Sequence, residues 1–217
     1  MNKIIVYTAN FGDKDSIKPV GRKEKGVDYI CFTDNPRGTP KSWESIQTCS
    51  FSDSPRRTAR WLKANPHILF PEHEYSIWVD GRVSLKKSVK SLLKLLKPKN
   101  GQEKELAVSK HPDRDCIYDE ADVCKEFGLE KENNINYLIN EIRLKGYPEH
   151  NGLSETAILV RKNTNKIRAF NINWSNIVVQ TCIRDQLSFN YLLWALKIDY
   201  ENIPTSYFNK GKHARSE

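Results

Sequence analysis

Short β-rich runs alternate with helical segments along this chain, and this alternation constrains its fold more than any other feature. Strands are expected over residues 3–8, 28–33, 75–79, 105–109 and 156–161. Helices are expected over residues 54–64, 118–127, 135–144, 164–178 and 184–197. Such alternation favours an α/β fold with a mostly parallel central sheet and helices on both faces. Because 217 residues suffice for one sizeable core, we expect a single domain over residues 1–217.

The chain is basic, since 35 Lys and Arg residues exceed 27 Asp and Glu residues, a net charge of +8. Such a surface attracts polyanions, anionic lipid head groups or phosphorylated ligands. Six lysines gather around four leucines in one segment: Lys86, Lys87, Lys90, Lys94, Lys97, Lys99, Leu92, Leu93, Leu95 and Leu96. This pattern predicts an amphipathic helix whose basic face is either solvated or in peripheral contact with a membrane. A nucleic-acid-binding module would place aromatic residues between the lysines, so no nucleic-acid partner is expected.

The remaining composition points to an intracellular globular protein. Five cysteines are scattered without C-x-x-C or another metal-binding spacing, and we expect reduced structural thiols. Met1 is followed by a polar pair and a short β-like run, not by the charged region and apolar stretch of a signal peptide. No segment approaches the roughly 20 apolar residues of a membrane span. We therefore expect a cytoplasmic location, unless the chain is a piece of a longer protein.

Polar residues follow four of the expected strands, at the points where each strand ends. They are Thr8, Asn10 and Gly12; Asp34 and Asn35; Asp80, Gly81 and Arg82; and Lys110 and His111. In open α/β sheets, ligands bind in the crevice outside the carboxyl ends of the strands. The sequence therefore predicts a ligand site at this edge of the sheet.

Asp80 is the residue of this group best placed for chemistry. It follows the apolar run Tyr75 to Val79, so a rigid strand delivers its carboxylate to the crevice. A carboxylate there can bind a divalent cation or a sugar hydroxyl. Arg82 lies two residues further on and can clamp a diphosphate through two parallel hydrogen bonds. The alternative is that Asp80 only caps the turn before Gly81.

Five segments of the chain resemble, in the same order, segments of glycosyltransferases of the GT-A fold. They are residues 6–12, 31–35, 77–82, 151–160 and 184–190. The string Ile77 to Arg82 lies where those enzymes carry the acidic DxD motif that meets a metal-bound nucleotide diphosphate. Residues 60–67 and 110–115 also fit the glycosyltransferase-like family of plant mucilage and pectin biosynthesis. A further resemblance is to the amino-terminal domain of chlorella-virus glycosyltransferases that decorate the capsid.

The resemblance implies a hexosyl- or deoxyhexosyltransferase. It would move a sugar from a nucleotide-diphosphate donor, with a UDP-sugar favoured, to a hydroxyl of a glycan or glycoprotein acceptor. The residues expected to bind the donor are Thr8, Asn10, Gly12, Asp34, Arg60, Lys63, Asp80, Arg82 and Lys212. Those expected to bind the acceptor are His111, Arg114 and Asp115, while Trp174 and Trp194 either stack on a sugar or pack in the core. The alternative function is a non-catalytic nucleotide-sugar or nucleic-acid binding module.

Two carboxylates are candidates for the catalytic base. Sugar transfer passes through an oxocarbenium-like state, and an inverting enzyme needs a carboxylate to accept the proton of the acceptor hydroxyl. Asp185 is the first choice, because it begins a helix whose dipole keeps a carboxylate ionised. Glu155 is the second choice. The alternative for Asp185 is a capping role alone, and the sequence leaves retention or inversion open.

The metal is the point at which the chain departs from the resemblance. The third position of the acidic motif is Arg82 instead of a carboxylate. Either Arg82 neutralises the diphosphate without a metal, or Asp80 binds Mn²⁺ or Mg²⁺ together with another ligand. Residues 209–213 are similar to the terminal loop that completes the metal site in glycogenin-like enzymes, which implies His213 as that ligand. The alternative is a basic tail without a metal.

Overall fold

The structure, a computed structural model, describes residues 3–13, 15–50, 52, 54–98 and 101–211. Its strands are β1 (Ile4–Asn10), β2 (Val27–Thr33), β3 (Glu44–Gln47), β4 (Tyr75–Val79), β5 (Val83–Leu85), β6 (Leu106–Lys110), β7 (Ser154–Lys162), β8 (Glu201–Asn202) and β9 (Phe208–Lys210). Its helices are α1 (Pro55–Ala64), α2 (Pro66–Leu69), α3 (Val89–Lys94), α4 (Ile117–Glu126), α5 (Glu132–Leu144), α6 (Asn165–Gln180) and α7 (Gln186–Ala195). The alternation of strands and helices expected from the sequence is confirmed.

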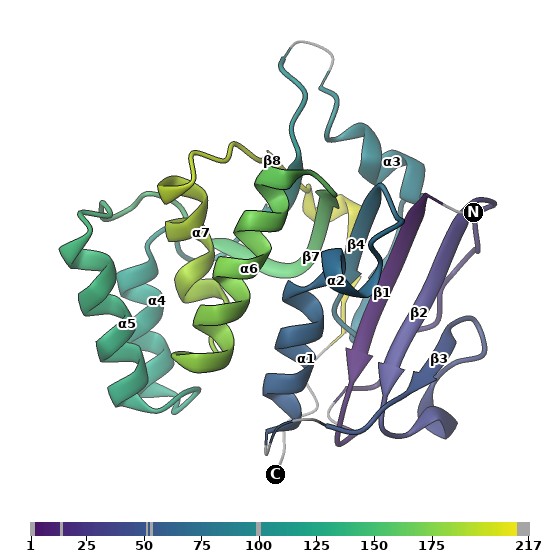
Figure 1. Ribbon diagram of the computed structural model, residues 1–217, viewed down its shortest axis with the longest axis horizontal. Coiled ribbons are helices and arrows are strands. Elements are labelled where there is room, and N and C mark those ends of the chain that lie inside the picture. The colour runs from purple at the N-terminus through teal and green to yellow at the C-terminus, as the bar shows by residue number, and fades with distance from the viewer. Residues whose placement is uncertain (1–2, 14, 51, 53, 99–100, 212–217) are drawn as a thin grey trace.

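A seven-stranded sheet with the order β3-β2-β1-β4-β7-β6-β8 forms the centre of the described chain (Figure 1). Within this sheet β7 alone runs antiparallel to its neighbours, so the expected mostly parallel arrangement is confirmed. Because β7 is reversed, its first residues lie beside the last residues of β4 and β6. Val79 pairs with Ile158, and Lys110 pairs with Ser154. The start of β7 thus joins the edge where the parallel strands end.

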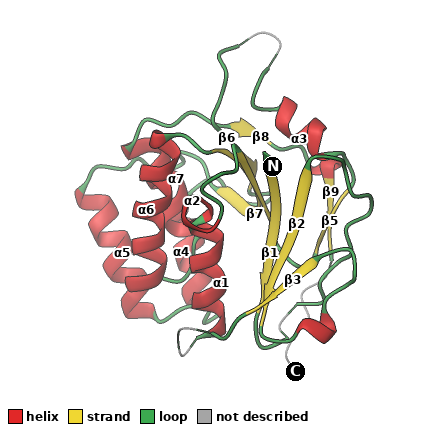
Figure 2. Cartoon of the chain, turned by 45° about the vertical axis from the view of Figure 1, so that its right-hand side comes forward, coloured by secondary structure: helices red, strands yellow, loops and turns green. Residues whose placement is uncertain are grey.

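The two faces of the sheet have different covers. Helices α1, α6 and α7 pack on one face, where Tyr7, Trp78, Trp174 and Phe189 belong to a shared hydrophobic core. The other face is covered by α3, by the β5–β9 ribbon and by the loop between β1 and β2. Figure 2 shows α1, α4, α5, α6 and α7 gathered on one side and α3, β5 and β9 on the other. Helices α4 and α5 share a third core with residues of α7.

Local sequence signals account for the start of α1. The hydroxyl of Ser54 accepts a hydrogen bond from the backbone N–H of Arg57, and Pro55 is the first helical residue. This is the N-cap followed by proline that helix starts favour. The helix that begins here carries Arg60 and Lys63 toward the carboxyl edge of the sheet.

The lysine-rich segment forms a shorter helix than expected. Helix α3 spans only Val89–Lys94, and Lys86 and Lys87 precede it. The reason is the pairing of β5 with β9, after which the backbone N–H of Lys86 donates to the carbonyl of Tyr207 at 2.8 Å. The chain stays extended until Ser88 caps the helix. None of the described helices is long and apolar enough to span a bilayer.

Candidate active site

Side chains from β4, β7, α1 and the start of α7 meet near the carboxyl edge of the sheet. Asp80 leaves β4 at this edge, and its backbone N–H donates to the carbonyl of Ala157 in β7 at 2.8 Å. Thr156 precedes Ala157, and Lys63 reaches the same place from α1. Asp80, one of the polar residues that follow an expected strand, therefore lies beside Lys63 at this edge.

Asp80 is held by one carboxylate oxygen and presents the other. The indole N–H of Trp78 donates to Oδ1 at 2.7 Å, and the Lys63 ammonium lies 3.7 Å from the same oxygen. Among the residues that the structure describes, no hydrogen bond reaches Oδ2. The side chain is 16% exposed, so the carboxylate lies at the surface of the site in a fixed orientation.

Lys63 and Asp185 form the buried part of the site. The ammonium nitrogen of Lys63 lies 2.6 Å from Oδ2 of Asp185 and donates to the hydroxyl of Thr156 at 2.9 Å. Thr156 in turn donates to Oδ2 of Asp185 at 2.8 Å. The rings of Trp78 and Trp174 lie 5.7 and 5.8 Å from the ammonium. Lys63 and Asp185 are 1% and 2% exposed, so this ion pair lies behind Asp80 and away from solvent.

Neighbouring cations keep Asp185 ionised, and the alternative capping interaction is not observed. It occupies the N-cap position of α7, yet its side chain makes no capping hydrogen bond. Burial raises the pKa of this carboxyl, but Arg60, whose Nε lies 3.4 Å from Oδ1, and Lys63 outweigh it and hold the pKa well below its usual range. Burial lowers the pKa of Lys63, while Asp185 and Asp80 act in the opposite direction. A carboxylate held in this way is a weak proton acceptor.

Glu155 differs from Asp185 in exposure and partner. It is the second residue of β7 and its side chain is 15% exposed. The ammonium of Lys210 from β9 pairs with Oε2 of this carboxylate. Glu155 therefore presents a partly accessible carboxylate at the edge where Asp80 lies.

The residues expected to bind the donor at the ends of β1 and β2 hold the local loops together. The amide of Asn10 donates to the carbonyl of Asp15 at 2.9 Å and accepts from its N–H at 3.1 Å. The N–H of Gly12, a residue with φ of +65°, donates to Asp34 at 2.9 Å. Thr8 is fully buried, and its hydroxyl has no hydrogen-bond partner within the described part of the chain. The structure thus brings the ends of β1 and β2 side by side.

Arg82 follows the turn at Asp80 and is partly exposed. Its carbonyl accepts a hydrogen bond from Gly211 at 2.8 Å, which places the described end of the chain beside this turn. No ion pair engages its guanidinium among the described residues. Lys212 and His213, the two remaining residues expected at the donor and metal site, lie outside the described residues.

The three residues expected to bind the acceptor lie between β6 and α4, and each has a protein partner. The ring Nδ1 of His111 accepts from the backbone N–H of Arg114 at 3.2 Å, and burial lowers the pKa of this histidine. Arg114 donates to the buried carboxylate of Glu120 at 2.8 Å. Asp115 contacts the ring of His150 at 2.8 Å.

Glu120 is a residue that sequence reasoning missed. Its carboxylate is 2% exposed and also pairs with Arg184, at 3.2 Å, so it ties the start of α4 to the segment before α7. A signal existed in the sequence, because Glu120 interrupts the apolar face that Ile117, Ala121 and Cys124 form on one helix. An acidic residue on such a face indicates a buried partner.

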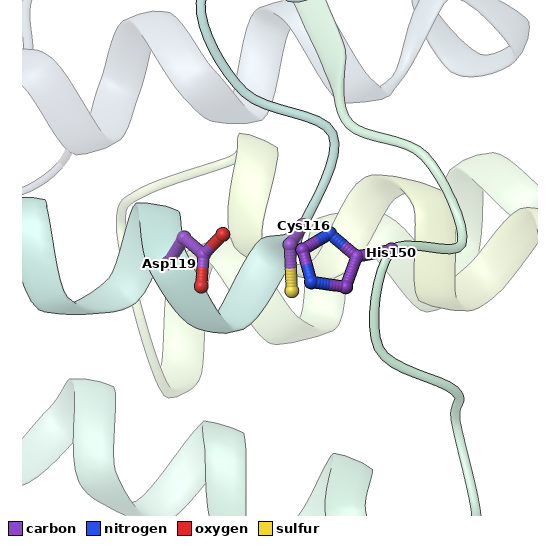
Figure 3. A group of neighbouring side chains, drawn as sticks. All are labelled: Cys116, Asp119 and His150. Atoms are coloured by element: carbon purple, nitrogen blue, oxygen red, sulfur yellow. The ribbon is translucent and has the colours of Figure 1, made fainter.

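A second group of polar side chains lies beside the acceptor-binding candidates. The possible metal-binding atoms of Cys116, Asp119 and His150 lie within 4.8 Å of one another (Figure 3). Cys116 and Asp119 come from the start of α4, and His150 comes from the segment before β7. This group includes neither Asp80 nor Glu155. Its members are scattered in the sequence without a metal-binding spacing, which is why the sequence did not indicate it.

The two tryptophans considered as stacking platforms have different environments. Trp174 is fully buried, and its indole N–H donates to the carbonyl of Asp185 at 3.1 Å. Trp194 is exposed, and its ring centroid lies 5.5 Å from that of Tyr147. The core-packing alternative therefore holds for Trp174.

A family model described as TOD1/MUCI70, glycosyltransferase-like domain, matches residues 43–214. The chain belongs to this family. The matched residues include Lys63, Asp80, Glu155 and Asp185, so the TOD1/MUCI70 domain carries all four side chains of the site. The expected resemblance to the plant mucilage family is confirmed, and so is the prediction of a glycosyltransferase at the level of the family.

Individual relatives agree with the TOD1/MUCI70 membership. The probable hexosyltransferase MUCI70 of Arabidopsis thaliana is 26% identical over 154 residues, which is 67% of this chain and 26% of the relative. The chain thus spans about a quarter of the length of that curated relative. Among solved structures, the apo bifunctional glycosyltransferase WbbM has a TM-score of 0.54 at 10% identity, covering 94% of this chain and 39% of WbbM. This likeness confirms the glycosyltransferase-like fold.

A glycosyltransferase involved in glycosylation of the major capsid of PBCV-1 is also similar. It matches with a TM-score of 0.48 at 9% identity, covering 92% of this chain and 81% of that structure.

Proposed function

We propose that this TOD1/MUCI70 domain transfers a sugar from a nucleotide-diphosphate donor, with a UDP-sugar favoured, to a hydroxyl of a glycan or glycoprotein. The observation that carries the proposal is how the carboxylate of Asp80 is held. A buried strand ends at this residue, Trp78 fixes one of its carboxylate oxygens, and the other has no hydrogen bond among the described residues. This is the arrangement a donor-binding carboxylate needs, because its orientation is set before the ligand arrives.

Arg60 and Arg82 are the cations proposed to stabilise the departing diphosphate. Arg60 is partly exposed on α1, and Arg82 is partly exposed after Asp80. Lys63 lies deeper and pairs with Asp185, so its proposed part is to hold Asp80 and Asp185 in place. A guanidinium matches the paired oxygens of a diphosphate, and the charge it neutralises grows as the sugar leaves.

Asp80 can supply one ligand atom to a divalent cation. Oδ2 of Asp80 is a hard carboxylate oxygen of the type that Mg²⁺ and Mn²⁺ prefer, although the neighbouring Lys63 reduces the negative charge there. We propose Mn²⁺ or Mg²⁺ held by Asp80 and by His213, which lies outside the described residues. When bound, such a cation would neutralise part of the diphosphate charge.

Glu155 is the better candidate for the base. A base must reach the acceptor hydroxyl, and Glu155 is partly exposed whereas Asp185 is buried against two cations. Asp185 is therefore proposed as a positioning residue that keeps Lys63 and Arg60 in place. In this proposal the ion pair between Lys210 and Glu155 loosens when the acceptor binds.

Calorimetric titration with UDP and GDP, with and without Mn²⁺, tests donor binding. The wild type is compared with Asp80→Asn and with Asp199→Asn, a matched change at an exposed aspartate. The proposal predicts that UDP binds, that Mn²⁺ strengthens binding, and that only Asp80→Asn removes this effect. If neither nucleotide binds under any condition, the proposed donor site is wrong.

A further inference from the structure

A cavity of about 610 Å³ lies on the face of the sheet opposite α1. Its floor includes Val6 of β1 and Val79 of β4, and Val83 of β5 lies beside them. Tyr29 and Trp43, whose ring centroids lie 6.3 Å apart, form part of its wall. The volume is within the range of about 300–1,000 Å³ that small-molecule sites have.

The rim of this cavity is strongly basic. The cations that line it are Arg22, Lys23, Lys25, Lys86, Lys87 and Lys90. The one carboxylate in the lining, Glu24, accepts hydrogen bonds from the backbone N–H groups of Val89, at 2.6 Å, and Lys90, at 3.4 Å. Within the described part of the chain, none of the six cations forms an ion pair. Six cations and one carboxylate leave a net charge of +5 at the rim, a large part of the +8 of the whole chain.

The cavity is separate from the site at Asp80. Ile17 covers Gly81 so closely that a Cβ on Gly81 would lie 2.4 Å from Cδ1 of Ile17. The backbone N–H of Lys18 donates to the carbonyl of Gly81 at 2.7 Å, and the carbonyl of Lys18 accepts from the indole N–H of Trp43 at 2.8 Å. These contacts close the loop between β1 and β2 over the turn that follows Asp80. A ligand in the cavity would therefore lie against the face of the sheet opposite α1, with the turn at Gly81 between it and the open side of Asp80.

We propose that this cavity binds one phosphorylated hydrocarbon chain, such as a lipid phosphate. The mutual repulsion of six unpaired cations destabilises the empty rim, and a phosphate relieves it. The apolar side chains of Val20 and Leu85 also line the cavity and are partly exposed, and only an apolar group gains free energy by covering them. A hydrophilic polyanion would contact only the cations of the rim, and a neutral amphiphile would contact only the apolar lining. The lipid phosphate uses both, and the proposal does not depend on the sugar-transfer reaction.

Titration of the full chain with hexyl, octyl and decyl phosphate, below their micelle concentrations, tests the cavity. Calorimetry should give one site, and each added methylene should tighten binding by up to about fourfold. Inorganic phosphate and neutral decyl glucoside should each bind at least about 100-fold more weakly than decyl phosphate. Decyl phosphate should also change the fluorescence of the wild type, and Trp43→Phe should lose that change.

Two variants locate the site. Lys86→Ala/Lys87→Ala should weaken decyl phosphate at least about tenfold, while Lys131→Ala/Lys145→Ala, a matched pair at the ends of α5, should leave it unchanged. Val20→Phe, which fills space in the cavity wall, should remove the dependence on chain length. Circular dichroism confirms that each variant is folded.

Three results would overturn the proposal. One is equal affinity for inorganic phosphate and decyl phosphate, which would show a charged surface without an apolar site. Another is an equal loss of decyl phosphate binding in the variants Lys86→Ala/Lys87→Ala and Lys131→Ala/Lys145→Ala. The third is binding to phosphatidic acid vesicles without any binding of monomeric decyl phosphate, because that outcome describes attraction to a charged bilayer and leaves the cavity unused.

Discussion

Lys63 and Asp185 lie 122 residues apart in the chain and form a buried ion pair with 2.6 Å between Nζ and Oδ2. This pair links α1 to the start of α7, and the ammonium of Lys63 also lies 3.7 Å from Asp80. The buried ammonium therefore faces two carboxylates, and it adds a longer contact to the hydrogen bond by which Trp78 orients Asp80.

Replacing Lys63 alone should destabilise the protein strongly. Lys63→Met leaves Asp185 buried without its closest cation, and such changes cost about 3–5 kcal/mol. Urea unfolding measures the loss. The double variant Lys63→Met/Asp185→Leu removes both charges and should recover most of it. A single variant that loses less than about 1 kcal/mol would contradict the importance of this pair.

Asp185 should make the stability depend on pH in the acidic range. Because Arg60 and Lys63 hold the pKa of Asp185 well below its usual range despite burial, the unfolded chain takes up this proton first. The stabilisation is therefore complete above about pH 4, the ordinary aspartate pKa, and is lost as pH falls toward the lowered folded-state pKa. Unfolding free energies of wild type and Asp185→Asn between pH 7 and pH 3 check this. The wild type should lose stability more steeply, and parallel profiles would contradict the assignment.

A buried arginine gives a third prediction. Arg161 is fully buried without a carboxylate partner among the described residues, and its guanidinium donates to the hydroxyl of Tyr7 at 2.6 Å. That hydroxyl donates to the carbonyl of Lys63 at 2.8 Å, and burial raises the pKa of Tyr7 to about 12. Tyr7→Phe should therefore cost about 1–3 kcal/mol in urea unfolding. Tyr137→Phe, at an exposed position, should stay within about 0.5 kcal/mol. Equal effects of the two changes would show that the hydroxyl of Tyr7 is not needed.

The sequence predicted the main strands and helices because their hydrophobic patterns are strong. It also located Asp80, because an apolar run that stops at an acidic residue marks a strand end. It could not predict β3, whose four residues are all exposed at the edge of the sheet, or β8, which has only two residues. Nor could it predict the reversal of β7, since a buried strand has the same hydrophobic pattern in either direction.

The partners of the site residues could not be predicted from the sequence, for a different reason. Asp185 was expected to depend on a helix dipole, whereas Arg60 and Lys63 from α1 control its charge. Arg114 was expected to bind a sugar, and the structure shows it paired with Glu120. Both contacts join segments distant in the chain, and only the folded arrangement reveals which charges meet.

The proposed roles of Glu155 as base and of Asp185 as positioning residue should be distinguishable by kinetic and stability measurements on their variants. Glu155→Gln removes a partly exposed carboxylate and should lower kcat by about 10²–10⁴-fold while the protein remains folded. Glu126→Gln, at an exposed position on α4, is the matched control and should leave kcat unchanged. Release of UDP in the presence of an acceptor measures the rate. A Glu155→Gln variant with more than half of the wild-type kcat would exclude Glu155 as the base.

The most direct test of the central claim is release of UDP from a panel of UDP-sugars, measured for wild type, Asp80→Asn and Asp199→Asn. Wild type and Asp199→Asn should release UDP from at least one donor at equal rates, and Asp80→Asn should be at least about 100-fold slower while remaining folded. Equal rates for wild type and Asp80→Asn, or no release from any donor, would contradict a sugar-transfer site centred on Asp80.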